Sequence, residues 1–126
     1  MPLEIHTLRI MHDFTIALQV LVAASIFFVW VVRYANIIEE FKQYGLPNWL
    51  RDLVGILKIT FALMLLIGIE RERFALIGGV GIAILMGAAV MTHLLVKNPA
   101  LKMLPSLTLM ILSAVIAWMN YRMLKG

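Results

Sequence analysis

The sequence predicts an all-α fold, a polytopic membrane protein that forms a four-transmembrane-helix bundle with a short interfacial helix or turn in its first loop. Of its 126 residues, 63% are hydrophobic and 14% are charged, and the mean hydropathy is +0.96. A soluble domain this short needs more polar surface, because small folds leave much of their area in water. Four long apolar runs, at about residues 14–32, 53–69, 74–96 and 105–121, fit one membrane domain over residues 1–126.

The first run, residues 14–32, carries no charge. At a rise of about 1.5 Å per residue it extends roughly 28 Å, which is close to the thickness of the hydrocarbon core. A cleavable signal peptide is the alternative, but its apolar region is only about 7–15 residues long. The sequence therefore favours a retained transmembrane helix.

The connection that follows, residues 33–52, is longer than the other two. Ile37, Ile38, Phe41 and Tyr44 recur at helical spacing within it. The turn-forming stretch from Gly45 to Pro47 then interrupts the pattern. This connection is predicted to contain a short interfacial helix, or the end of a long first helix, followed by a turn.

The remaining runs are separated by short polar connections. The second run is interrupted only by Lys58, and the third contains one titratable group, His93. Pro105 opens the fourth run and suits a first helical turn, where its missing N–H has no partner to lose. Residues 70–73 form a tight charged hairpin, and residues 97–102 join the third run to the fourth.

An even number of crossings places both termini on one side of the membrane. The basic residues are divided evenly between the two sides, so the positive-inside rule gives a weak signal. Arg71 and Arg73 lie in the most compact basic loop, which favours termini on the cytoplasmic side.

Small residues recur every four positions in the third run, at Ala75, Gly79, Ala83 and Gly87. Such a stripe lets two helix backbones approach closely in lipid. A helix contact inside the bundle is the favoured interpretation, and a homodimer contact is the alternative.

Polar groups gather in one leaflet. The second run enters the membrane on the side where the third run leaves it, so Lys58 and His93 lie at similar depth. The candidate polar pocket consists of Lys58, His93, Thr60, Thr92 and Ser106.

Two alternatives to a pocket stay open. Lys58 shares a helix face with Gly55 and Ala62, which favours an inward direction, but its long stem could instead reach the headgroups. His93 could bond a carbonyl or a lipid phosphate at the interface.

Several kinds of site are excluded. The chain has no cysteine, which excludes disulfides, thiolate metal sites and cysteine nucleophiles. His6 and His12 precede the first run on the side opposite His93, so a bis-histidine haem is unsupported. No metal-ligand cluster or catalytic motif occurs, and aromatic and basic residues are not interleaved as in nucleic-acid binders.

The stretches "GLPNWLRDLVGILKITFALMLLIGI" and "LIGGVGIAILMGAAVMTHLLVKNPALKMLPSLTLMILS" resemble the DoxX-like family of small four-helix integral membrane proteins. The resemblance covers roughly residues 41–113, and its motif turns include Gly45, Pro47, Asn98 and Pro99. It implies a four-helix bundle in a bacterial inner membrane. The family is named after the membrane subunit of a thiosulfate:quinone oxidoreductase, and related proteins act as assembly chaperones or thiol–quinone enzymes.

Two functions from different classes follow. The favoured one is a non-enzymatic accessory or assembly protein, with the lipid bilayer and a membrane protein or a second copy as partners. The alternative is the membrane subunit of a quinone-linked oxidoreductase, with a quinone or small lipophile near Lys58 and His93, which can donate hydrogen bonds. Its electron carrier would come from a partner. A small transporter is disfavoured by the few charges inside the spans.

Overall fold

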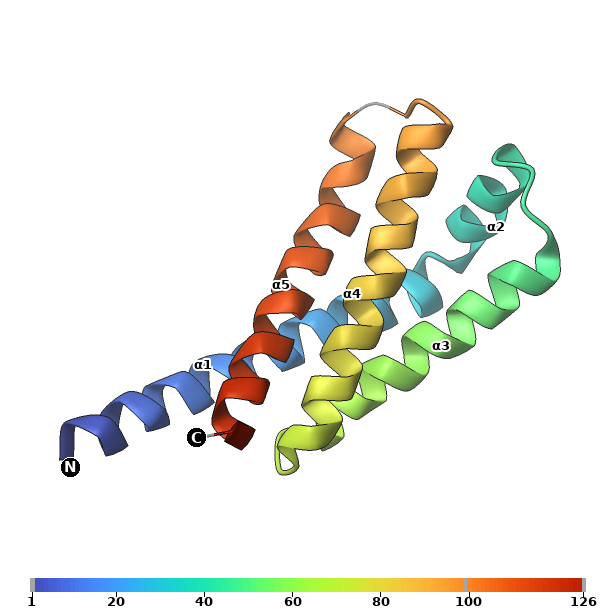
Figure 1. Ribbon diagram of the computed structural model, residues 1–126. Helices are drawn as coiled ribbons and strands as arrows, with labels where there is room; N and C mark the ends of the chain where they lie inside the picture. The colour runs from blue at the N-terminus through green and yellow to red at the C-terminus, as the bar shows by residue number, and fades with distance from the viewer. Residues whose placement is uncertain (1, 99, 126) are drawn as a thin grey trace.

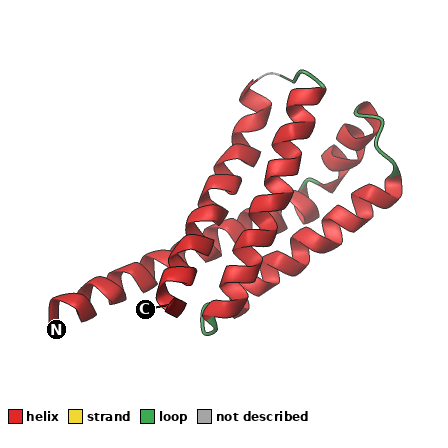
Figure 2. Cartoon of the chain, viewed as in Figure 1, coloured by secondary structure: helices red, strands yellow, loops and turns green. Residues whose placement is uncertain are grey.

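The computed structural model of the chain describes residues 2–98 and 100–125. Pro99, one of the predicted turn residues, lies outside the described residues. The elements are α1 (Pro2–Phe27), the π-helix η1 (Phe28–Val32), α2 (Tyr34–Gln43), α3 (Asn48–Ile67), α4 (Glu72–Leu95) and α5 (Ala100–Lys125). All described elements are helices joined by short turns (Figure 2), which confirms the predicted all-α class.

The long helices alternate in direction. The turn between α3 and α4 lies at the same end of the molecule as both termini, whereas the α2–α3 turn and the α4–α5 loop lie at the opposite end (Figure 1). α1 crosses behind α4 and α5 in this view and leads through η1 into α2. This arrangement brings the polar residues of α3, α4 and α5 to common ends of the bundle.

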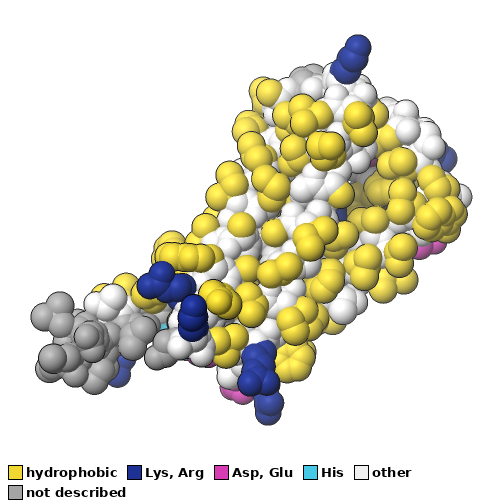
Figure 3. Space-filling view, viewed as in Figure 1, with side chains coloured by type: hydrophobic (Ala, Val, Ile, Leu, Met, Phe, Trp, Pro, Cys, Tyr) yellow, Lys and Arg dark blue, Asp and Glu magenta, His cyan; other side chains and the backbone are white. Residues whose placement is uncertain are grey.

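Three helical segments are long and apolar enough to cross a membrane, namely Arg9–Val32, Glu72–Leu95 and Ala100–Lys125. Hydrophobic side chains cover the middle of the face seen in Figure 3, and Lys and Arg lie mainly toward its ends. The protein is therefore a multi-pass membrane protein. α3 has 20 residues, but any 18-residue stretch of it includes Arg51, Asp52 and Lys58, so its crossing stays a prediction.

The long helices begin before the predicted apolar runs, because hydropathy marks the lipid-facing length and the helical backbone continues into the polar flanks. α1 begins at Pro2, well before the predicted start at residue 14. The expectation that Pro105 opens the last helix is wrong, since α5 begins at Ala100 and encloses Pro105. Pro105 therefore supplies no N–H to the carbonyl of Leu101.

The first loop contains a separate helix. The chain leaves η1 at Arg33, whose dihedral angles are φ −104° and ψ 26°, and α2 starts at the next residue. α2 ends in a Schellman turn, in which Leu46 N–H donates to the Phe41 carbonyl at 2.9 Å and Gly45 has φ 70°. Pro47 is extended and precedes α3, so the turn predicted from Gly45 to Pro47 is present.

Glycines hold α4 close to α5 at one level. A methyl group at Gly79 would lie 3.0 Å from the Ser113 carbonyl oxygen and 3.1 Å from the Ala117 nitrogen, both backbone atoms of α5. The predicted stripe thus makes a contact inside the bundle here. Its other members differ: Ala75 is buried beside Gly68 of the α3–α4 turn, and Ala83 is half-buried. A methyl group added at Gly87 would lie 3.6 Å from the Met110 sulfur, an ordinary contact distance.

A second glycine face of α4 packs on α3 and was missed from the sequence. A methyl group at Gly78 would lie 2.8 Å from the Phe61 carbonyl oxygen, and one at Gly81 would lie 2.6 Å from the Phe61 ring. Because Gly78 and Gly79 face two different helices, α4 is tightly held on both sides near the α3–α4 turn. In the opposite half of α4, a methyl group added at Gly87 would meet Met110 of α5 and no atom of α3 within 4 Å.

Candidate functional site

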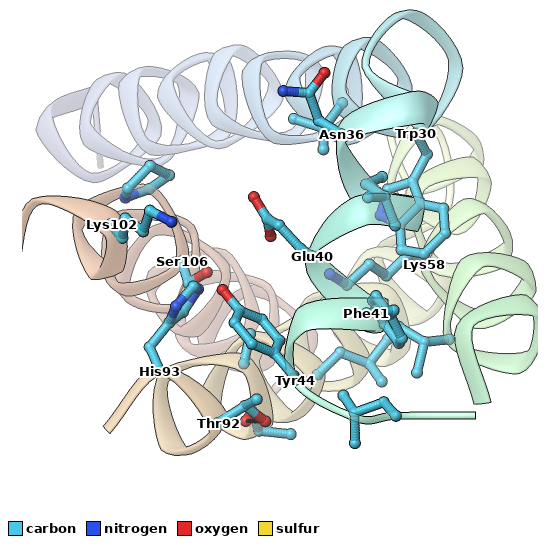
Figure 4. A pocket seen from close by; sticks show the side chains of 18 of the residues that line it. Trp30, Asn36, Glu40, Phe41, Tyr44, Lys58, Thr92, His93, Lys102 and Ser106 are labelled. Carbon is cyan, nitrogen blue, oxygen red and sulfur yellow. Dashed lines mark hydrogen bonds between the residues drawn. The ribbon is translucent and has the colours of Figure 1, made fainter. Parts of the chain in front are cut away.

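A cavity of about 350 Å³ opens where the helices spread apart, between η1, α2, α3, α4 and α5. This volume is within the range of about 300–1,000 Å³ typical of small-molecule sites. Much of its wall is apolar, including Val54, Leu85, Ala88 and Ala89. Polar side chains project into the same hollow from several helices (Figure 4).

The cavity follows from how α2 fills the gap between α3 and α4. These two helices touch closely near Gly78 and diverge toward the α2–α3 turn, where α2 lies between them and α5 (Figure 1). α2 has one buried residue, Ile37, while Phe41 and Tyr44 line the cavity without filling it. A short amphipathic helix thus covers a space too wide for it to close.

Lys58 lies at the wall of this cavity, six residues and so about 9 Å of helix beyond Asp52. Its Nζ lies over the ring of Trp30, 5.4 Å from the ring centroid. Gly55 makes room for the indole, since a methyl group there would lie 2.6 Å from a Trp30 ring carbon. The lysine therefore faces the bundle.

The Lys58 ammonium has no hydrogen-bond or ion-pair partner among the described residues. Glu40 of α2 also lines the cavity, and Figure 4 shows its carboxylate pointing into the same hollow. Within the described chain the ion pair closer than 4.0 Å is Arg51 with Asp52, at 3.2 Å. Three donors of the ammonium are consequently available to a bound molecule.

His93 belongs to a hydrogen-bonded group that ties α4 to the end of α2. The Nδ2 atom of Asn98 lies 2.8 Å from Nδ1 of His93 and donates to the Tyr44 hydroxyl at 2.7 Å. The rings of Tyr44 and His93 meet edge to face with centroids 5.9 Å apart. Burial raises the pKa of Tyr44, which Asn98 opposes and Glu40 reinforces, so the phenol stays protonated at neutral pH.

The structure brings together four of the five predicted pocket residues. Lys58, His93, Thr92 and Ser106 line the cavity. Thr60 does not, because it lies two residues after Lys58 and so about 200° around the helix. Its side chain is exposed and donates to the Ile56 carbonyl at 2.7 Å.

Several residues that line the cavity were missing from the predicted pocket. Among them Glu40 comes from α2, Tyr44 directly follows α2, and Lys102 comes from the start of α5. The helical spacing of Ile37, Phe41 and Tyr44 was a usable signal, since it places Tyr44 on the face that turns inward. Nothing in the sequence indicated that Asn98, known only as a turn position, would contact both Tyr44 and His93.

A second polar group lies in the other half of the bundle. Gln19 of α1 donates from Nε2 to the Leu65 carbonyl at 2.8 Å, and Asn120 of α5 donates to Gln19 Oε1 at 3.3 Å. Both side chains are about 1% exposed. We call this pair with the Leu65 carbonyl the amide cluster. It links α1, α3 and α5 by hydrogen bonds.

The described residues contain no group of three His, Asp or Glu side chains arranged to hold a metal ion. Among known proteins, a sequence model of the DoxX-like family matches residues 14–116 of the chain. Searches of curated proteins and of solved structures gave no match.

Proposed function

The chain belongs to the DoxX-like family, and we propose that it is a four-span membrane protein whose cavity binds a lipophilic small molecule. The observation that carries this proposal is Lys58, an ammonium without a hydrogen-bond partner among the described residues, facing a largely apolar hollow. Placing a charged group in such surroundings costs free energy unless hydrogen bonds offset the loss of water. A ligand with acceptor atoms would supply those bonds.

The chemistry of the wall favours a flat ring that carries carbonyl oxygens and an apolar tail, as in a quinone. Lys58 on α3 and His93 on α4 can donate hydrogen bonds from different helices. Trp30 offers an aromatic face, and Leu85 and Val54 offer apolar surface. The proposal concerns binding; electron transfer in a quinone-linked oxidoreductase would need a carrier on a partner subunit.

We propose that four helices cross the membrane, with α3 as the fourth. Arg51 and Asp52 lie in its first turns and pair with each other, so the remaining length is apolar except for Lys58. We place the protein in a bacterial inner membrane with cytoplasmic termini. Because the chain has no cysteine, single cysteines can be added directly at Gln43 and Arg73. If a membrane-impermeant thiol reagent labels the cysteines at both positions from the same side of the membrane, α3 does not cross it.

The binding experiment uses Trp30 as the reporter. With Trp49 and Trp118 replaced by Phe, Trp30 is the remaining tryptophan of the three in the chain. We expect a decyl-substituted benzoquinone to quench its fluorescence saturably in lipid nanodiscs. Ala89→Phe, which fills the cavity, should weaken this quenching at least tenfold. The matched control Ile84→Phe changes a side chain that is 67% exposed on the outer face and should leave it unchanged.

Equal, non-saturating quenching in both variants would show partition into lipid and contradict the pocket. Purification from native membrane distinguishes an accessory role from ligand binding. An assembly function would be favoured by two results together. The first is that a membrane protein co-purifies in stoichiometric amount with both the unaltered chain and Ala89→Phe. The second is that the quinone gives no saturable quenching.

A further inference from the structure

The side-chain amide of Asn98 lies between His93 and Tyr44. Its Nδ2 atom carries two hydrogens and has two neighbours, the Tyr44 hydroxyl oxygen at 2.7 Å and His93 Nδ1 at 2.8 Å. A nitrogen that donates to Nδ1 requires a lone pair there. The imidazole is then neutral and carries its proton on Nε2.

The backbone holds Asn98 in this place independently of its side chain. α4 ends in a Schellman turn, in which Asn98 N–H donates to the His93 carbonyl at 3.0 Å. The turn requires Lys97 to adopt φ 58°, a conformation that is usually left to glycine. Asn98 is thus fixed next to His93 by a backbone bond and by a side-chain contact.

The donor set of the cavity follows from this arrangement. Figure 4 shows the His93 ring, the Tyr44 hydroxyl, the Lys58 ammonium and the Glu40 carboxylate directed into one hollow. The Tyr44 oxygen accepts from Asn98, so its own proton is available to donate. Lys58, Tyr44 and the Nε2–H of His93 then offer donors, and Glu40 is the carboxylate among the described lining residues.

We infer that Asn98 is a positioning residue that holds His93 as an Nε2–H donor, so that the pocket selects a head group that accepts hydrogen bonds. For a quinone, this means the oxidised dicarbonyl form over the reduced dihydroxy form. The reduced form carries two hydroxyls at opposite ends of the ring, and the Glu40 carboxylate can accept from only one of them. The second hydroxyl has no carboxylate among the described lining residues, and an unpaired hydroxyl lowers affinity. The ligand part of the inference rests on the proposed function, whereas the state of His93 does not.

The first test reads the histidine without any ligand. The chain has three histidines, so a His93→Phe variant assigns the His93 signals in ¹⁵N-histidine-labelled protein. We expect an unprotonated Nδ1 and a protonated Nε2. In Asn98→Asp the carboxylate only accepts hydrogen bonds, so Nδ1 should gain a proton. Asn48→Asp, at the exposed start of α3, is the matched control and should leave the His93 signals unchanged. A protonated Nδ1 in the unaltered chain would overturn the inference.

The second test compares the decyl benzoquinone with its quinol, measured anaerobically by competition against the Trp30 quenching signal. We expect the quinone to bind about tenfold more tightly, as one unpaired polar group typically costs. The preference should fall in Asn98→Asp and persist in Asn48→Asp. Equal affinities in the unaltered chain would overturn the selection. Failure of both forms to bind would overturn the proposed function and this selection with it, while the histidine signals would still decide the role of Asn98.

Discussion

The bundle contains two polar regions that solve the problem of burying hydrogen-bonding groups in opposite ways. In the amide cluster, Gln19 donates to the Leu65 carbonyl, Asn120 donates to Gln19 and to the Ile116 carbonyl, and both side chains are about 1% exposed. In the cavity, Lys58 faces a hollow without a hydrogen-bond partner among the described residues. The first region holds helices together, and the second is suited to hold a ligand.

The spacing of the helices explains the difference. Near the amide cluster, Gly78 and Gly79 bring α4 within contact of the α3 and α5 backbones. Near the cavity, a methyl group added at Gly87 would meet the Met110 sulfur at an ordinary contact distance. α2 occupies the widening gap between α3 and α4. Close packing lets short amides reach carbonyls directly, whereas wide spacing leaves long side chains such as Lys58 to face empty volume.

The largest expected effect tests this difference in spacing. Gly78→Ala would place a methyl group 2.8 Å from the Phe61 carbonyl oxygen, so the helices must separate. We expect a loss of about 1–3 kcal/mol in the free energy of unfolding. Gly87→Ala is the matched variant near the cavity, where the helices spread apart. It should leave the free energy of unfolding unchanged or raise it by up to about 1 kcal/mol. Equal losses in detergent unfolding curves would contradict the comparison.

The next effect concerns the cavity. Lys58→Met keeps the length of the side chain and removes its charge. Because the lost contact is a hydrogen bond from a charged group, quinone affinity should fall about tenfold or more. The free energy of unfolding should stay the same or rise, since a buried charge is removed. Lys42→Met, exposed on α2, is the control for charge alone and should retain affinity.

A smaller effect is expected in the amide cluster. The N–H of Ile69 bonds Leu66 rather than Leu65, so Gln19 supplies the hydrogen bond that the Leu65 carbonyl would otherwise lack. Gln19→Leu should therefore lower the free energy of unfolding by about 1 kcal/mol, the usual scale for interhelical hydrogen bonds in membranes. Exposed Gln43→Leu is the matched control. Unchanged stability together with lost quinone affinity would reverse the roles of the two regions.

The smallest effect concerns the turn that carries Asn98. Lys97 adopts φ 58° in a Schellman turn, and the corresponding position at the end of α2 is Gly45, with φ 70°. Lys97→Gly should raise the free energy of unfolding by up to about 1 kcal/mol, because glycine adopts this conformation without a steric penalty. Quinone affinity should not change. A fall in affinity would show that the Lys97 side chain itself takes part in binding.

Hydropathy was sufficient to predict where the long helices lie, because a membrane requires long apolar helices whose backbones are internally bonded. Glycine and proline were sufficient for the turn at Gly45–Pro47, since few residues other than glycine adopt the φ of 70° found at Gly45 and a proline disfavours helical backbone at the residue before it. The direction of successive helices also predicted that Lys58 and His93 share one end of the bundle, and both line one cavity. Whether that cavity binds a ligand remains a proposal.

Only the tertiary structure decided what surrounds these residues. Thr60 points outward because helix rotation separates it from Lys58, while Glu40 and Tyr44 enter the site because α2 folds back over it. Asn98 gained its contacts with Tyr44 and His93 from a left-handed backbone at Lys97, which no residue type announced. The sequence by itself determined where the apolar helices lie and at which end of the bundle Lys58 and His93 lie, because hydropathy and helical rise depend only on neighbouring residues. The hollow and its hydrogen-bond partners depended on how helices distant in the chain pack.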